Sequence, residues 1–257
     1  MAEILDYSNG FGRQGMPQGL ARRLIRKAIH FFSYNLVLKR ETTRVARAAG
    51  FRLLVRPTVF HPRYFLTSEY FARFISGLDL AGQRVVDVGT GSGILALAAA
   101  RAGAARVLAI DINPNAALTA SENARANGLG DHVSALCSNL LSAIAPRPFF
   151  DVILSNPPSF PGKPRDLADR AWHAGPDYSD IAALFDQTRE RLASGGRLYL
   201  LLSSDSDLDL LGMLVKNARL RAQQVGERSI FIESLILYEL QAEDAPARQE
   251  QEQEQVA

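Results

Sequence analysis

The chain has 257 residues, of which 47% are hydrophobic and 22% charged, and its formal net charge is +2. This is the composition of a folded globular protein, long enough for one sizeable α/β domain with an appendage. The single cysteine, Cys137, excludes an internal disulfide framework and a cysteine-rich zinc site, and its apolar neighbours predict that it is buried. We find no leader peptide and no apolar run of the roughly 20 residues that cross a bilayer, so we expect a cytoplasmic protein.

The small net charge hides an uneven distribution. Residues 20–63 contain a single acid, Glu41, among many basic residues: Arg22, Arg23, Arg26, Lys27, Lys39, Arg40, Arg44, Arg47, Arg52, Arg56 and Arg63. Three interpretations of this basic segment stay open: a solvated face packed on the main domain, a surface for RNA phosphates, or an attachment to an anionic membrane surface. We expect a flexible leader over residues 1–19 and a disordered Gln/Glu-rich tail over residues 242–257.

The first expected elements belong to the basic segment. Apolar residues from 20 to 32 recur at helical spacing, which predicts an amphipathic basic helix, with a second helix over residues 42–49 that ends at Gly50. Residues 51–55 have the pattern of a strand. Residues 68–78 then predict a helix with Ser68 as its N-terminal cap. We therefore assign residues 20–63 to a basic helical extension and residues 64–241 to the main domain.

From residue 84 onward, strand and helix patterns alternate. Apolar strands are expected at 84–88, 106–111, 132–137, 150–155 and 197–203, and helices at 93–103, 113–128, 180–196 and 207–218. Two final β-rich segments, 221–231 and 233–240, follow each other without a helix between them. Continuous apolar strands separated by helices predict a parallel sheet covered on both faces, here of seven strands with an antiparallel edge.

A glycine-rich turn, DVGTGSG at residues 87–93, joins the first strand of this sheet to a helix. Glycine lets backbone N–H groups approach a ligand closely, but the spacing fits neither a nucleotide-triphosphate loop nor the dinucleotide fingerprint. Asp111 ends the next strand, where an acid is placed to accept both hydroxyls of a ribose. The structural alternative is a turn that only packs the helix on the sheet, with Asp111 capping the next helix.

These residues resemble the class I S-adenosylmethionine-dependent methyltransferases, through VVDVGTGSGILAL and LAIDINP. The resemblance implies a Rossmann-like fold and S-adenosylmethionine as cofactor, with no metal. It also implies that Asn139 takes the place of an acid which often binds adenine in this family. The cofactor residues implied in this way are Asp87, Gly89, Thr90, Gly91, Gly93, Asp111, Ile112, Asn139 and Asn156.

The strand at residues 150–155 runs directly into Asn156, Pro157 and Pro158. Proline fixes its own φ and restricts the residue before it, so Asn156 is held stiffly at the end of the strand. Enzymes of this family with Asn-Pro-Pro and then an aromatic residue methylate planar nitrogens, which implies catalytic roles for these three residues. Ser159 stands where that aromatic residue is usual, with Phe160 next, and both are candidate substrate residues. The plain alternative is a loop that leaves a strand.

The downstream segments resemble the HemK-like release-factor glutamine methyltransferases, over about residues 55–240 in all. Ala174-Gly175 replaces their Gly-Gly pair, and the helical domain with which the bacterial enzymes dock their substrate has no counterpart here. The resemblance implies a protein glutamine amide as methyl acceptor, in a translation factor among other proteins. Trp172 and His173, in the long loop from 159 to 179, either form a lid over the substrate or pack the loop on the body.

Three other functions stay open on the sequence alone. The basic segment favours an exocyclic amino group of an RNA adenine or guanine, and Ser159 favours a small-molecule amine. A cofactor-binding but inactive scaffold is the alternative outside enzymes. The sequence leaves the oligomeric state open.

Overall fold

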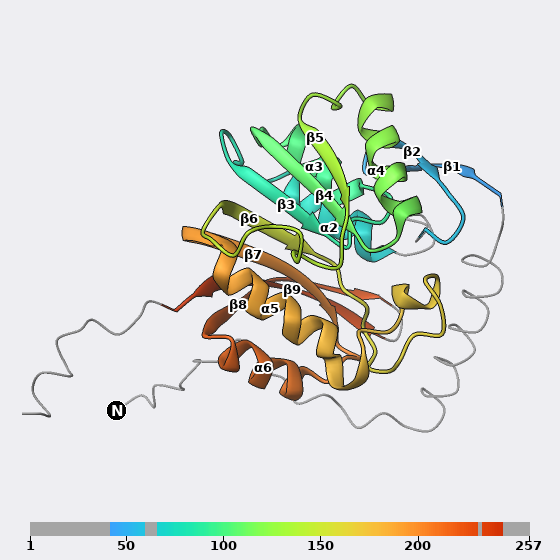
Figure 1. Ribbon diagram of the computed structural model, residues 1–257. Helices are drawn as coiled ribbons and strands as arrows, with labels where there is room; N and C mark the ends of the chain where they lie inside the picture. Colours follow the sequence, from blue (N-terminus) through green and yellow to red (C-terminus); the bar gives the residue numbers. More distant parts are fainter. Residues whose placement is uncertain (1–41, 60–65, 231–232, 244–257) are drawn as a thin grey trace, which may run out of the picture.

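The protein is described by a computed structural model over residues 42–59, 66–230 and 233–243 (Figure 1). Its main sheet has seven strands in the order β5-β4-β3-β6-β7-β9-β8. The strands are β3 (Arg84–Val88), β4 (Arg106–Asp111), β5 (Val133–Cys137), β6 (Phe150–Ser155), β7 (Leu192–Ser203), β8 (Leu220–Ile230) and β9 (Glu233–Ala242). The helices are α2 (Leu66–Ile75), α3 (Ile94–Arg101), α4 (Pro114–Ala126), α5 (Ser179–Arg191) and α6 (Leu208–Asn217), with short 3-10 turns at Asp169–Ala171 and Pro176–Tyr178.

The sheet confirms the predicted architecture. Strands β5, β4, β3, β6 and β7 are parallel, whereas β9 pairs antiparallel with both β7 and β8. Along the chain, β4 and β5 are added successively on one side of β3, whereas β6 is added on its other side and β7 follows next to β6. Strand order therefore reverses between β3 and β6, and the carboxyl ends of these two strands lie side by side. Ligands of open α/β sheets bind at such a point.

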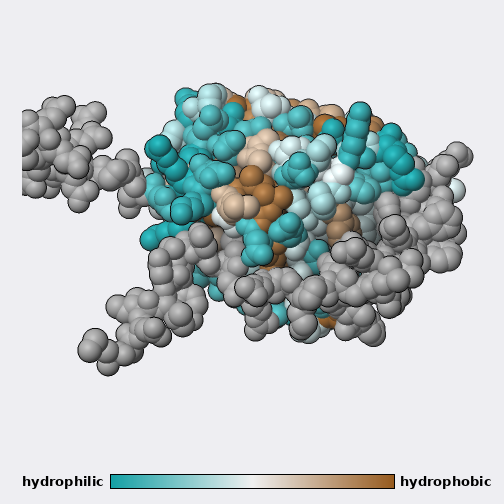
Figure 2. All heavy atoms as spheres, turned by 90° about the horizontal axis from the view of Figure 1, so that it is seen from below, coloured by the Kyte–Doolittle hydropathy of each residue, from teal (hydrophilic) through white to brown (hydrophobic). Residues whose placement is uncertain are grey.

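Each face of the sheet has its own apolar core. Val85 of β3 packs with Phe71 of α2 and Leu97 of α3, while the neighbouring Val86 packs on the opposite face with Phe185 of α5 and Leu211 of α6. Burying one such side chain contributes about 1.5–3 kcal/mol. On the face seen from below, the described residues that are visible are mostly hydrophilic around a small hydrophobic area (Figure 2).

Residues 44–55 form a separate antiparallel hairpin of β1 (Arg44–Ala48) and β2 (Phe51–Val55), so the helix expected over residues 42–49 is wrong. The alternation of burial explains the strand, because Ala46 and Ala48 are buried while Val45 is 58% exposed. Ala49 (φ 48°) and Gly50 (φ 77°) make the two-residue turn. Positive φ at both positions matches the right-handed twist of a hairpin, so Gly50 is a turn residue here and not a helix stop.

Asn123 of α4 and Asn127, the residue that caps the C-terminus of α4, fasten this hairpin to the main domain. The backbone N–H of Leu54 donates to Asn123 Oδ1 at 2.7 Å, and Asn123 Nδ2 donates back to the Leu54 carbonyl at 2.8 Å. Asn127 repeats this pair with the backbone of Arg52 at 3.1 and 2.9 Å. Asn123 Nδ2 also donates to the Ser92 carbonyl at 2.8 Å, which links the hairpin to the glycine-rich turn.

Two smaller predictions are also wrong. Helix α2 extends from Leu66, so Ser68 lies inside its first turn and is not its cap. Cys137 is exposed, because it ends β5 at the rim of the sheet. The expected leader (1–19), the helix expected over residues 20–32 and nearly all of the expected tail lie outside the described residues. Among the helices within the described ranges, none is both long and apolar enough to cross a membrane.

Candidate active site

A cavity of about 700 Å³ opens at the carboxyl ends of β3, β4 and β6. It gathers most of the residues that the sequence singled out. Among its lining residues are Gly89, Thr90, Gly91, Asp111, Ile112, Asn139, Asn156, Pro157, Pro158, Ser159 and Phe160. Segments from Gly89 to Phe160, 71 positions apart in the chain, therefore meet at one site, where strand order reverses.

The glycine-rich turn is shaped to leave backbone open to this cavity. Gly89 (φ 78°) and Gly91 (φ 54°) both have left-handed backbone, and a Cβ added at either would meet nothing within 4 Å. The N–H groups of Gly89 and Thr90 donate to the Ile110 carbonyl at 2.9 Å each, which fixes the turn against β4. A side chain at either glycine would project into the free space that a ligand needs.

Asp87 and Gly93 lie beneath this turn. Asp87 is fully buried, and its Oδ2 accepts from Thr90 Oγ1 at 2.6 Å and from the Ala96 N–H at 3.1 Å. Burial raises the pKa of Asp87 to about 7, against the opposing effect of these two hydrogen bonds. At Gly93 (φ 83°), a Cβ would lie 2.9 Å from the Cα of Ala120, so this glycine allows α3 to pack closely on α4. Asp87 thus fixes the turn through hydrogen bonds, and Gly93 allows it to lie close to α4.

Asp111 joins the turn to the end of β4. Its Oδ2 accepts from the Gly91 N–H and its Oδ1 from the Asn113 N–H, both at 2.9 Å. Each carboxylate oxygen keeps a second lone pair, so the pair remains able to accept from two hydroxyls. Burial raises the pKa of Asp111, while these backbone N–H groups lower it.

The segment that follows the β1–β2 hairpin, residues 56–59, supplies a wall of the cavity that the sequence did not reveal. Thr58 and Val59 line it, and Asn113 Nδ2 donates to the Thr58 carbonyl at 3.1 Å and to its Oγ1 at 3.0 Å. Asn113 Oδ1 also caps α4 by accepting from the Asn115 N–H at 3.0 Å. Asn113 thus looks like an ordinary cap in the sequence, and only the tertiary structure gives it a second partner.

Asn156 directly follows β6 and lines the cavity. Its Nδ2 donates to Thr67 Oγ1 and to Ser68 Oγ, at 3.4 Å each, and both hydroxyls come from the first turn of α2. With the amide nitrogen engaged in this way, the amide oxygen stays available to accept. Sequence reasoning missed Thr67, and it gave Ser68 only the role of a cap.

The far end of the cavity lies beyond Pro158. Phe160, Leu167, Arg170 and Trp172 of the long loop line it, and the rings of Phe160 and Trp172 stack with their centroids 6.0 Å apart and 6° between their planes. Trp172 therefore packs within the loop and also faces the cavity. Three carboxylates at this end had no signal in the sequence: Asp180, Asp205 and Glu233.

The chain has a sequence match to a known family over part of its length. Residues 67–157 match the family of ribosomal protein L11 methyltransferases (PrmA). The ribosomal protein L11 methyltransferase of Alteromonas mediterranea is 51% identical over 67 residues, which are 26% of this chain and 23% of that protein. The chain thus spans about a quarter of the length of the curated relatives that it matches first.

Solved structures extend the likeness in fold beyond this segment. A ribosomal protein L11 methylase from Lactobacillus delbrueckii subsp. bulgaricus superposes with a TM-score of 0.53 at 23% identity, over 70% of this chain and 80% of that one. A T. thermophilus 16S rRNA N2-guanine methyltransferase (RsmC), in complex with AdoMet and guanosine, gives 0.56 at 23% identity, over 77% and 50%. These likenesses confirm the Rossmann-like methyltransferase fold.

The family match and the fold together confirm the coarser expectation. The chain has the Rossmann-like methyltransferase fold, and its residues 67–157 match a methyltransferase family. The matches do not confirm the HemK-like subgroup.

Proposed function

We propose that the protein transfers a methyl group from S-adenosylmethionine to a nitrogen atom of a protein, and that this protein belongs to the translation apparatus. One observation carries the proposal. Asn156, which follows β6 and precedes Pro157 and Pro158, lies in the same cavity as the glycine-rich turn and Asp111. A site for the methyl donor and a rigid group of hydrogen-bond acceptors are thus adjacent.

The residues present fit the cofactor. Gly89 and Gly91 leave the free space that a Cβ would fill, and Asp111 keeps lone pairs for ribose hydroxyls. Ile112 and Asn139 line the part of the cavity next to Asp111, where adenine would lie. When bound, the cofactor supplies an electrophilic methyl group on a sulfonium ion.

Asn156 and Pro157 act on the acceptor. The Asn156 side-chain oxygen and the Pro157 carbonyl accept the hydrogens of the acceptor nitrogen and direct its lone pair toward the methyl group. Thr67 and Ser68 hold the amide group in the orientation that this requires. Orientation and fixed dipoles of this kind contribute several kcal/mol to catalysis without a strong base. As the new N–C bond forms, the S–C bond of the cofactor would break, S-adenosylhomocysteine would leave, and the methylated nitrogen would release one proton to water.

Two observations support a protein substrate. The segment that carries the turn, Asp111 and Asn156 resembles enzymes named for ribosomal protein L11, and the downstream segments resemble the HemK-like enzymes. We therefore propose ribosomal protein L11 and protein glutamine amides as the first acceptors to test. The setting for both is the cytoplasm.

A second candidate acceptor is an RNA base. The observation that favours it is the outer face of the β1–β2 hairpin, where Arg47 and Arg52 lie directly opposite each other across the two strands. Both are exposed, and like charges in this position repel unless an anion lies between them. Phosphates of RNA are anions that arginine binds well.

The test uses the purified protein, methyl-labelled S-adenosylmethionine and an extract of cells that lack the protein. Label is followed separately in proteins, RNA and small molecules, with ribosomal protein L11 added to a parallel reaction. Asn156→Ala is the matched control, because the cofactor contacts of the glycine-rich turn and Asp111 remain. Amino-acid analysis of labelled protein distinguishes methylated glutamine from methylated amines.

The outcomes separate the candidates. Label in protein that disappears with Asn156→Ala supports the proposal. Label that enters RNA alone moves the acceptor to the second candidate. Absence of label from every fraction, with measurable cofactor binding, contradicts methyl transfer and favours an inactive scaffold.

A further inference from the structure

The loop after Pro158 closes on itself and forms a wall of the cavity. The Phe160 N–H donates to the Trp172 carbonyl at 3.2 Å, and the Ala174 N–H donates back to the Phe160 carbonyl at 2.9 Å. A third bond, from the Gly162 N–H to the Gly175 carbonyl at 2.9 Å, completes the neck of the loop. A loop that is closed in this way presents its inner side chains at fixed positions.

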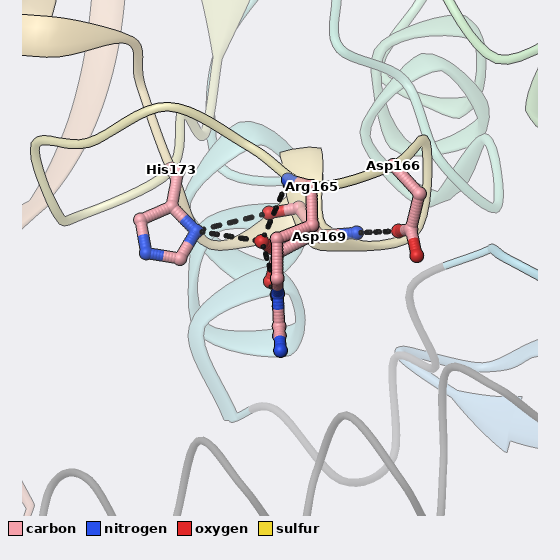
Figure 3. Close-up of polar contacts among 4 residues, drawn as sticks. All are labelled: Arg165, Asp166, Asp169 and His173. Carbon is pink, nitrogen blue, oxygen red and sulfur yellow. Dashed lines mark hydrogen bonds and ion pairs between the residues drawn. The ribbon is translucent and has the colours of Figure 1, made fainter.

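Asp169 lies at the centre of this loop, and Figure 3 shows Arg165, Asp166 and His173 around it. Its carboxylate is buried and accepts three hydrogen bonds of 3.0 Å from Arg165, one from the backbone N–H and two from the guanidinium. His173 Nδ1 lies 3.4 Å from Asp169 Oδ2. Asp166 Oδ1 accepts from the Asp169 N–H at 2.8 Å.

These contacts keep Asp169 ionised. Burial alone would raise the pKa of this carboxyl, but the hydrogen bonds from Arg165 and the attraction of His173 outweigh it and hold the pKa well below its usual range. A buried carboxylate that loses such partners is costly. The cluster therefore has one strongly preferred geometry.

The backbone of Asp169 transmits this geometry to Trp172. Its carbonyl accepts from the Trp172 N–H at 3.0 Å and from the His173 N–H at 3.3 Å, across the 3-10 turn Asp169–Ala171. The Trp172 ring then stacks on Phe160, and both rings line the cavity beyond Asn156. An aromatic face is thus fixed at the acceptor end of the cavity.

We propose that Trp172 contacts the methyl acceptor, and that Asp169 is the positioning residue that fixes Trp172 for this contact. The proposal rests on the proposed function for the identity of the acceptor end. Trp172 contributes apolar ring surface against which the acceptor packs.

The role of Asp169 is tested without any substrate, because Trp172 is the only tryptophan in the chain. Acrylamide quenching of its fluorescence is measured with saturating S-adenosylhomocysteine in the wild type, in Asp169→Asn and in Lys163→Gln. Lys163 is exposed in the same loop and serves as the matched control. We expect the quenching constant to rise about twofold or more in Asp169→Asn, because the loop opens locally, and to stay unchanged in Lys163→Gln. An unchanged constant in Asp169→Asn overturns the positioning role.

The role of Trp172 is tested by steady-state kinetics with ribosomal protein L11, or with the labelled protein fraction if L11 takes no label. We expect Trp172→Leu and Asp169→Asn to raise KM for the acceptor roughly three- to tenfold, while Trp172→Phe keeps it near the wild-type value. The Kd of S-adenosylmethionine, measured by calorimetry, stays unchanged in all three. A purely structural role would instead lower kcat through the active fraction, or weaken cofactor binding, and leave KM in place.

Failure of this proposal and failure of the proposed function give different results. If the wild type transfers label but Trp172→Leu leaves KM unchanged, the contact with Trp172 is refuted and the methyltransferase function stands. If the wild type transfers no label, the proposed function fails and the contact with an acceptor falls with it. The quenching experiment still decides the role of Asp169 in that case.

Discussion

The two halves of the cavity are built in different ways. In the cofactor half (residues 84–157), the groups that face the ligand are the backbone of a glycine-rich turn, beside which no Cβ occupies the cavity, and polar side chains at the ends of parallel strands. In the acceptor half (residues 158–230 and 233–243), they are side chains on a closed loop, at the start of α5, and at Ile230 and Glu233, the last residue of β8 and the first of β9. The first half resembles many other proteins in sequence, whereas the second resembles the solved structures in fold.

This difference follows from what each half has to bind. A cofactor shared by many enzymes requires one binding geometry, and short sequence motifs at the ends of strands are enough to provide it. The acceptor differs from enzyme to enzyme, and loops on a rigid sheet change without loss of the fold. The two halves also treat a buried carboxyl in opposite ways, since the pKa of Asp87 is raised while that of Asp169 is lowered.

The largest effect on activity is expected from substitution of Asn156 in the acceptor role, and it is compared with substitution of Asn139 in the cofactor-binding role. Asn156→Ala should lower kcat by about 10²–10³-fold with little change in cofactor affinity, by analogy with the loss of one oriented dipole from an active site. Asn139→Ala should instead weaken cofactor binding about threefold to tenfold and leave kcat unchanged, because it removes one hydrogen bond in binding. Kinetics and calorimetry on both variants check this division. Equal effects on kcat would erase the distinction between the roles.

A large loss of stability is expected where the cofactor half packs most closely. Gly93→Ala should lower the free energy of unfolding by about 3 kcal/mol, since left-handed backbone and overpacking both contribute. Gly82→Ala is the matched control: Gly82 has φ 75°, but a Cβ there meets nothing within 4 Å. It should cost only about 1–2 kcal/mol. Denaturant unfolding measures both, and similar losses would refute the role of close packing against Ala120.

The two buried carboxyls should give the stability opposite dependences on pH. A folded-state pKa of about 7 means that the contribution of Asp87 to stability is complete below pH 4 and is lost as the pH rises through about 7. Asp87→Asn should therefore flatten the decline in this window, by about 1 kcal/mol per pH unit.

For Asp169 the sign is reversed, because its folded-state pKa is lowered. Its contribution is complete above pH 4 and is lost as the pH falls through its folded-state value, so Asp169→Asn should destabilise at neutral pH and approach the wild type in acid. Urea unfolding at a series of pH values tests both variants. If the free energy of unfolding of both variants changed with pH in the same direction relative to the wild type, the opposite pKa shifts of Asp87 and Asp169 would be contradicted.

The smallest effect is expected at the hairpin. Arg47→Gln should stabilise the protein by a few tenths of a kcal/mol, because it removes the repulsion from Arg52 across the strands. The gain should disappear in high salt, where exposed charges are screened. Thermal unfolding at low and high salt measures it. A gain that persists in high salt would show that charge is not the cause.

Prediction from sequence succeeded where local pattern and tertiary structure agree. The strands at 84–88, 106–111 and 150–155 have largely apolar sequences, which identifies them as strands of a buried parallel sheet. Because parallel strands end at one edge of a sheet, the glycine-rich turn, Asp111 and Asn156, which lie at the ends of these strands, could be expected to lie close together. It failed for residues 44–48, whose helix-compatible pattern is overridden by pairing with β2, a strand that is itself hydrogen-bonded to Asn123 of α4. It also missed Thr58, Asp180 and Glu233, whose place in the cavity depends on contacts between segments distant in sequence.

The paired amides of Asn123 and Asn127 have a consequence for the behaviour of the protein at high concentration. Spaced one helical turn apart, they present to the edge of β2 the donors and acceptors that a neighbouring strand would present. An open edge is a template on which other chains can add strands and aggregate. Helix α4 thus imitates a strand and closes this edge, and the carboxamides that hold the hairpin in place also protect the protein against self-association.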